Sequence, residues 1–173
     1  MKIKKMIFLS LLVSVGIALH IIESGIPVPF IAPGAKLGLA NMVNLITMVI
    51  FGYKYAFIVA VLRCLVAALG SGAVTGLFYS LSGALFSTAV MCMVYHHLSR
   101  YFSLIGVSIF GALAHNVAQL AVAGIMIANP YIFTYLPVMM LVSLFTGYFV
   151  GLASIYVTKQ LKSILSGNIL EKI

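Results

Sequence analysis

The sequence contains no aspartate, and only two of its 173 residues are acidic. Without aspartate the chain lacks the paired carboxylates that hold magnesium on a diphosphate, which excludes a magnesium-dependent prenyl transferase acting alone. It also has no GxxxxGK[ST] loop, so it cannot hydrolyse a nucleotide by that route. These absences predict a protein that is not an enzyme.

Cysteine and histidine are also scarce. Cys64 and Cys92 lie far apart inside apolar segments without CxxC spacing, which argues against a disulfide or a zinc site. His96 and His97 are adjacent, and the other two histidines stand alone, so none has the spacing of paired helical ligands. We therefore expect neither a metal nor another cofactor.

What the chain does contain is apolar sequence. It is 64% hydrophobic and 7% charged, with a mean hydropathy of +1.23, which lies far outside the range of soluble proteins. Six spans of about 20 residues would leave no room for a soluble domain. The sequence predicts one integral membrane domain, residues 1–173, built as a compact all-α bundle of six transmembrane helices.

The expected spans are separated by short turns rich in Gly, Pro or charge. Their approximate limits are Met6–Ser24, Leu37–Phe51, Tyr55–Leu69, a span after residue 76 that ends near Tyr95, Leu104–Ala128 and Leu136–Val157. The third is only about 22 Å long, short of a hydrocarbon core of about 30 Å. We expect the glycine-rich segment 70–76 to supply the missing length as irregular backbone inside the protein.

The basic residues orient this arrangement. Eight of the ten fall on the side of the N-terminus: Lys2, Lys4, Lys5, Lys54, Arg100, Lys159, Lys162 and Lys172. Both termini should therefore be cytoplasmic. The net charge of +8 is interpreted as an orientation signal and as contacts to anionic lipid, not as a nucleic-acid surface. The outward turns 26–36, 70–76 and 129–135 either gate an outward-facing site or merely end helices.

Two basic residues do not follow the positive-inside pattern. Lys36 falls on the outer side, and Arg63 lies within the third span, where a central arginine costs about 2.5–3.5 kcal/mol. Arg63 can be compensated by Glu23, by backbone carbonyls or by the anion of a ligand. In the last case Arg63 and Lys36 would bind that anion together, since the arginine fork suits carboxylate and phosphate.

Further polar residues are predicted at a similar depth: His20, Glu23, Asn41, Asn44, Tyr79, His115, Asn116 and Gln119. Hydrocarbon offers such groups no partner, so a polar cavity open to the outside would explain them together. For Asn116 or Gln119 taken singly, a hydrogen bond between helices is the simpler explanation.

Small residues recur every four positions in three spans, a pattern that lets helices approach closely in lipid. In spans four and six we expect this to serve internal packing. In the first span, Ser10, Ser14 and Ala18 form a candidate surface for docking a partner.

Residues 33–48, PGAKLGLANMVNLITM, follow a span ending in ES and precede FGYKYAFIVAVLRCLVAALGSG. Together they resemble the bacterial Gx transporter family, also labelled heptaprenyl diphosphate synthase component I. The layout is more distantly similar to the substrate-binding S components of energy-coupling-factor (ECF) vitamin transporters.

This resemblance implies six helices in a bacterial cell membrane and an outward-facing pocket. It also implies that Ser10, Ser14 and Ala18 occupy the place of a motif that docks a transmembrane coupling subunit with separate ATPases, although serines replace two of the usual alanines. The implied function is binding and movement of a small anionic or amphipathic substrate, such as an isoprenoid, a quinone precursor or a vitamin-like compound. The alternative is a non-transporting scaffold for polyprenyl diphosphate or quinone synthesis, or for a flavin-dependent redox system.

Overall fold

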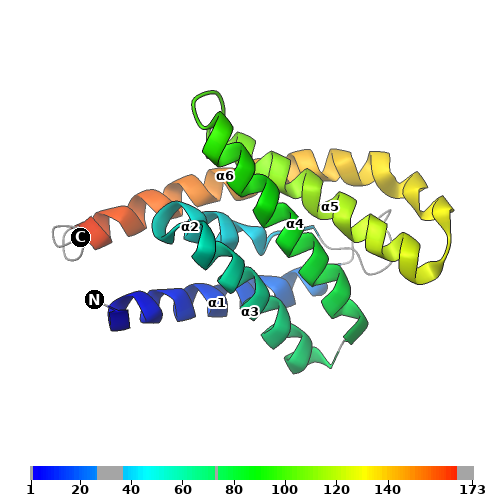
Figure 1. Cartoon of the computed structure of the whole chain (residues 1–173), viewed down its shortest axis with the longest axis horizontal. Coiled ribbons are helices and arrows are strands. Elements are labelled where there is room, and N and C mark those ends of the chain that lie inside the picture. The colour runs from blue at the N-terminus through cyan, green and yellow to red at the C-terminus, as the bar shows by residue number, and fades with distance from the viewer. Residues whose placement is uncertain (1, 27–36, 73, 167–173) are drawn as a thin grey trace.

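The computed structural model describes residues 2–26, 37–72 and 74–166, which form helices joined by short turns (Figure 1). No strand occurs within these ranges. The elements are α1 (Lys2–Ser24), α2 (Asn41–Phe51), α3 (Tyr53–Ser71), α4 (Val74–Leu98), α5 (Leu104–Ile127), the 3-10 helix η1 (Pro130–Tyr135) and α6 (Leu136–Ser166). The predicted all-α membrane fold is confirmed.

Helix α2 is the short element of the bundle. Five described helices are long and apolar enough to cross a membrane, whereas α2 has only 11 residues, or about 16 Å of rise. The predicted span at 37–51 begins too early, because the backbone at Gly38 has a φ of +83° and helical structure starts only at Asn41. The N-terminus of α2 therefore lies inside the protein.

The third span, in contrast, is longer than predicted. Helix α3 has 19 residues, or about 28 Å, and includes Gly70 and Ser71. Gly72 ends it with a φ of +67°, the left-handed conformation of a helix C-terminus, and α4 begins at Val74. Of the glycine-rich segment 70–76, Gly70 and Ser71 belong to α3 and residues 74–76 belong to α4, so most of its described part is helical and not irregular backbone.

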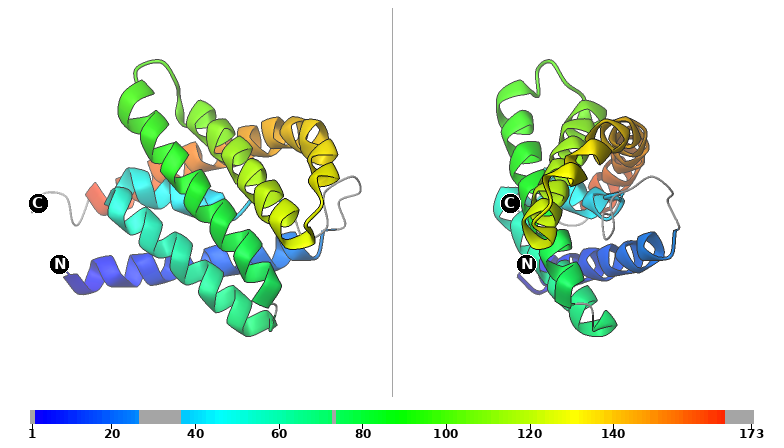
Figure 2. Two further views of the ribbon diagram at one scale, coloured as in Figure 1. Left: turned by 45° about the vertical axis from the view of Figure 1, so that its right-hand side comes forward. Right: turned by 90° about the vertical axis from the view of Figure 1, so that its right-hand side faces the viewer.

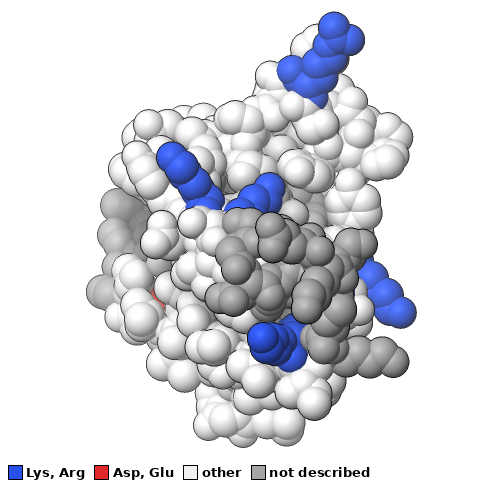
Figure 3. Space-filling view, turned by 90° about the vertical axis from the view of Figure 1, so that its left-hand side faces the viewer, with Lys and Arg blue, Asp and Glu red and all other residues white. Residues whose placement is uncertain are grey.

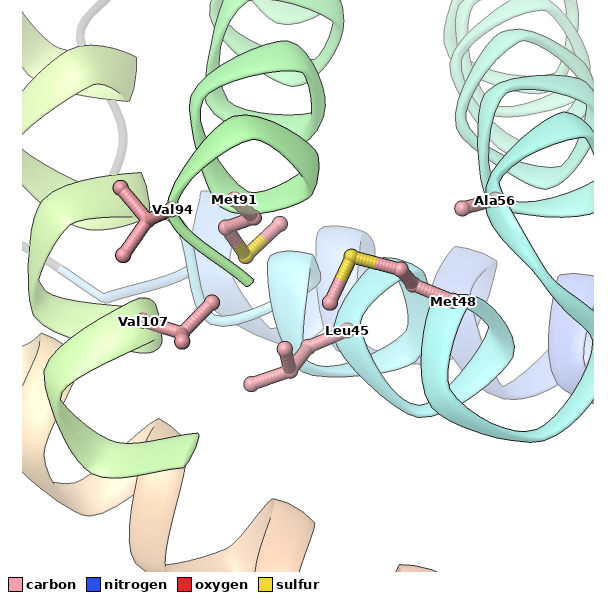
Figure 4. Close-up of a cluster of buried hydrophobic side chains, with 6 residues drawn as sticks. All are labelled: Leu45, Met48, Ala56, Met91, Val94 and Val107. Carbon is pink, nitrogen blue, oxygen red and sulfur yellow. The ribbon is translucent and has the colours of Figure 1, made fainter. Parts of the chain in front are cut away.

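Helix α2 occupies the middle of the bundle and contacts the other five α-helices. Most of its residues are buried, including the run Val43–Met48. One apolar cluster shows how it is held: Leu45 and Met48 of α2 pack with Met91, Val94 and Val107 of α4 and α5 (Figure 4). Burial on all sides explains why the α2 sequence is apolar throughout except for its asparagines and one threonine.

Glycines bring α5 and α6 into backbone contact. A Cβ at Gly147 would lie 2.7 Å from the Cα of Ile109, and one at Gly151 would lie 2.6 Å from the Cα of Ile105. In α4, Ser80, Ala84 and Thr88 are likewise buried. The small residues of spans four and six thus serve internal packing, as predicted.

The start of α1 and the end of α6 lie at the same end of the molecule (Figure 1). The space-filling view of that end shows several Lys and Arg side chains projecting from it (Figure 3). This grouping agrees with the charge asymmetry read from the sequence. Helix α1 runs along one edge of the bundle, away from α5 and α6, and packs against α2 and α3 (Figure 2).

Candidate functional site

Arg63 lies near the middle of α3, about 15 Å along the helix from Tyr53, and only 2% of its surface is exposed. Its Nε donates a hydrogen bond to Oδ1 of Asn44 at 3.2 Å, and its Nη2 donates to Oδ1 of Asn41 at 3.0 Å. Asn44 Nδ2 in turn donates to Oγ1 of Thr88 at 3.0 Å. Two amides of α2 therefore hold the guanidinium plane in place and tie it to α4.

Helix α1 covers the other side of this arginine. A Cβ at Gly16 would lie 3.0 Å from Cδ of Arg63, so only glycine permits this approach without displacing the arginine. The same face of α1 carries Glu23 one turn beyond His20.

Glu23 acts at the N-terminus of α2. Its Oε1 accepts hydrogen bonds from the backbone N–H groups of Gly38 and Leu39, the latter at 3.3 Å. The N-cap residue, Ala40, offers no side-chain cap. A carboxylate in this position pairs the N–H groups of the two residues before the N-cap and opposes the positive end of the helix dipole.

These groups surround a small internal cavity of about 10 Å³, room for roughly one water molecule. Its walls come from α1, the residues before α2, α3, α4 and α5: His20, Glu23, Gly38, Ala40, Arg63, Ser80, His115 and Gln119. Oγ of Ser80 is buried and has no hydrogen-bond partner among the described residues. The cavity wall thus has a hydroxyl donor as well as a carboxylate.

Glycines also shape the wall around His115. A Cβ at Gly83 would lie 2.6 Å from Cε1 of the ring, and one at Gly38 would lie 3.2 Å from its Cδ2. The imidazole is therefore packed between α4 and the residues before α2. This contact fixes the ring against the cavity.

A family described as heptaprenyl diphosphate synthase component I matches residues 12–157. The chain belongs to this family.

A solved structure described as the S component of a bacterial ECF transporter is similar to this chain, with a TM-score of 0.73 at 19% sequence identity. The match covers 95% of this chain and 99% of that chain. No curated protein matches the sequence. The family resemblance and the S-component-like fold expected from the sequence are confirmed.

The fold brings together most of the residues predicted for the site. His20, Glu23, Arg63, His115 and Gln119 line the cavity. Asn41 and Asn44 bind Arg63 directly. Lys36 lies outside the described residues.

Two predicted residues lie elsewhere. Tyr79 packs in an apolar cluster with Leu120, Ile132 and Met139. Asn116 Nδ2 donates to the backbone carbonyl of Met139 at 3.1 Å and to Oγ of Ser143 at 2.6 Å, so it joins α5 to α6. The simpler explanation offered for Asn116, a bond between helices, is the one that the structure supports.

Sequence reasoning missed the glycines that admit these side chains, and it missed Ala40 and Ser80 as cavity residues. Ser80 belongs to the small-residue repeat of α4. From the sequence it could serve helix packing or line a cavity, and the sequence does not distinguish these two roles. Gly38 lies inside the segment that carries the family resemblance, and its position could have been suspected from that.

Arg63 and Glu23 line the same cavity, and each is also hydrogen-bonded to α2 or to the residues before it. This arrangement suits binding more than chemistry. Among residues 2–26, 37–72 and 74–166, no group of three or more His, Cys, Asp or Glu is placed to hold a metal ion.

Proposed function

We propose that this protein is a substrate-binding membrane subunit of the S-component type, and that its substrate is a small anionic or amphipathic compound. An isoprenoid, a quinone precursor or a vitamin-like compound would fit this description. The observation that carries the proposal is Arg63, a buried cation held by two asparagines in a polar cavity that five segments share. Lys36 is proposed to contribute a second positive charge.

Binding requires the cavity to open. A volume of about 10 Å³ admits roughly one water molecule, so a substrate must separate the walls. Glu23 occupies two backbone donors in this wall, the N–H groups of Gly38 and Leu39. A carboxylate or phosphate on the substrate would take over these donors, because anions favour a helix N-terminus.

The test is ligand retention by the full-length protein purified gently in detergent, read by mass spectrometry of co-eluting small molecules. Arg63→Gln should lose the ligand, and Arg63→Lys should weaken retention about tenfold because lysine lacks the planar donor fork. Lys54→Gln is the matched control, since it removes a positive charge from the same helix outside the cavity.

The competing explanation is a purely structural pair between Arg63 and Glu23. It requires Arg63→Gln and Glu23→Gln to lower thermal stability by similar amounts, because each would strand a buried charge. Our proposal requires Arg63→Gln to lose ligand while its unfolding temperature stays near that of the parent. Full retention by Arg63→Gln would overturn the assignment.

The proposed partner is a transmembrane coupling subunit served by separate ATPases. The surface for it is the small-residue face of α1, namely Ser10, Ser14 and Ala18, all of which are exposed. A shallow groove along this helix is lined by Ser10 and Ser14 together with apolar residues such as Ile7 and Leu11. An exposed small face lets another helix approach closely, which is what docking in lipid requires.

We propose further that the protein resides in a bacterial cell membrane with both termini cytoplasmic. Single cysteines at positions 72 and 131, introduced into a variant of the protein without Cys64 and Cys92, should react with an impermeant reagent in intact cells. Cysteines at 54 and 100 should react only after permeabilisation. The reverse pattern would invert the topology. Position 34, also predicted to be outside, lies beyond the described residues.

A second candidate is a scaffold for polyprenyl diphosphate or quinone synthesis, or for a flavin-dependent redox system. The description of the matching family, which names a synthase component, favours the first of these. A scaffold should co-purify with a protein and without a small molecule, so the same preparation separates the two candidates.

A further inference from the structure

We propose that the basic end of the bundle holds a second binding site, one for the phosphate group of an amphiphile. A hollow of about 450 Å³ opens there between α6, the turn joining α4 to α5, and the end of α2. It is lined by Val49, Tyr95, Ser99, Phe102, Ser103, Leu104, Ile155, Thr158, Lys159 and Lys162. None of these residues borders the central cavity.

Two lysines supply the charge. Lys159 and Lys162 lie on one stripe of α6 together with Ile155 and Thr158, at the spacing that places residues on a single helical face. The chain has only two acidic residues. Glu23 lines the central cavity, and Glu171 lies outside the described residues, so no described carboxylate borders these lysines.

The opposite wall supplies neutral donors. Ser99 and Ser103 come from the turn between α4 and α5, and both are exposed. Ser103 is the N-cap of α5, yet its side chain makes no capping hydrogen bond. The first N–H groups of α5 therefore lack that cap, and a helix N-terminus in this state favours an anion.

Thr158 gives an independent indication of a ligand. It is 4% exposed, lines the hollow, and its hydroxyl has no hydrogen-bond partner among the described residues. One turn earlier, the buried Ser154 donates to the carbonyl of Val150 at 2.7 Å, as Thr47 does to that of Val43. Thr158 makes no such hydrogen bond to the carbonyl four residues earlier. A buried hydroxyl without a partner lowers stability unless a ligand binds it.

The remaining wall is apolar. Tyr95 and Phe102 stand beside Val49, Leu104 and Ile155. A ligand with a phosphate head and a hydrocarbon tail matches both walls, whereas free phosphate would leave the apolar one unused. Membrane phospholipids and prenyl phosphates share this chemistry. Several basic side chains gather at the end of the bundle where α1 starts and α6 ends (Figure 3).

The experiment measures binding to the full-length protein in maltoside micelles by native mass spectrometry. Two pairs of probes differ in phosphate content: dioleoylphosphatidylglycerol against dioleoylglycerol, and farnesyl diphosphate against farnesol. Inorganic pyrophosphate is the probe for a free anion. The pair that shows the larger difference identifies the source of the ligand.

We expect a phosphate-bearing amphiphile to bind at least about fivefold more tightly than its phosphate-free counterpart. Lys159→Gln with Lys162→Gln should weaken it about tenfold, and the isosteric Thr158→Val about threefold. Lys4→Gln with Lys54→Gln is the matched control, because it removes two basic side chains that do not line the hollow, and should change binding less than about twofold.

Three results would overturn the proposal. One is equal binding of the phosphate-free probes. Another is an equal loss in the two double-lysine variants, which would show general attraction to the basic end. The third is unchanged binding in Thr158→Val together with pyrophosphate binding as tight as that of the amphiphiles. Thermal unfolding of each variant shows that the fold is kept.

Discussion

Helices α1 and α5 are both apolar and long enough to cross a membrane, yet the bundle treats them differently. Of the most apolar window of α1, 17% is buried, against 44% for α5. Helix α5 meets α6 through glycines at backbone distance, while α1 packs on α2 and α3 and turns Ser10, Ser14 and Ala18 outward.

The difference separates a closely packed frame, α5 with α6, from a less buried edge, α1. At Gly147 and Gly151 the frame leaves no room for a side chain, and its helix α5 carries His115 and Gln119. Helix α1 contributes Gly16, His20 and Glu23 to the site, but little of it is held by the core. Substituting alanine for glycine in each region tests this contrast, because the same methyl group meets backbone in one and side chains in the other.

The largest effect is expected at the α5–α6 contact. Gly147→Ala and Gly151→Ala should each destabilise the protein by about 1–3 kcal/mol, since the methyl group meets the backbone of Ile109 or Ile105. Thermal unfolding in detergent measures this. Gly70→Ala, where nothing lies within 4 Å of the new Cβ, is the control and should be neutral or slightly stabilising. Equal stability of all three variants would show that the α5–α6 contact is not closely packed.

A smaller loss of stability, about 1 kcal/mol, is expected for Gly83→Ala. Its methyl group meets the ring of His115 at 2.6 Å, and a side chain can turn where a backbone cannot. Retention of the co-purifying ligand should nevertheless fall about tenfold, because the ring would enter the cavity. Retention at the parental level would place His115 outside the binding site.

For Gly16→Ala we expect a stability change within about 0.5 kcal/mol, since Cδ of Arg63, 3.0 Å away, needs to move by only a few tenths of an ångström. Ligand retention should drop two- to threefold, because the guanidinium shifts relative to Asn41 and Asn44. A stability loss as large as that of Gly151→Ala would show that α1 is packed as closely as α5 and α6.

The least effect on the isolated protein is expected from Ser14→Leu with Ala18→Leu. Both positions are exposed, so the unfolding temperature should barely change. Bulky side chains would nonetheless keep a partner helix away, and co-purification of a coupling subunit, or transport, should be lost. If this face of α1 contacts only lipid, the leucines would change neither co-purification nor transport. That result would contradict the docking proposal.

How much of this was accessible from the sequence differs between elements. The positions of α4, α5 and α6 were predicted within a few residues, except that α6 continues well past the expected end at Val157. The limits of α3 were predicted within two residues, although its extension to Ser71 was not expected, and the start of α2 was placed four residues too early. Both differences arise because Gly38 and Gly70 look alike in sequence. One takes a left-handed conformation that delays a helix, and the other lies within a helix.

The candidate site divides in the same way. Arg63 stood out by itself because a charge inside an apolar span is costly wherever it lies. Its partners did not. Asn41, Asn44 and Asn116 are the same residue type, each within an apolar segment, yet two bind the arginine and one joins α5 to α6.

By itself the sequence determined the membrane class, the helices and the grouping of basic residues at one end, since hydropathy and charge act locally along each segment. Only the tertiary structure decided which polar side chains share the cavity and which small face of a helix points outward. Those outcomes depend on how each helix is rotated about its own axis and how deeply it sits. Both are set by packing between segments distant in sequence, such as Gly83 against His115 and Gly16 against Arg63.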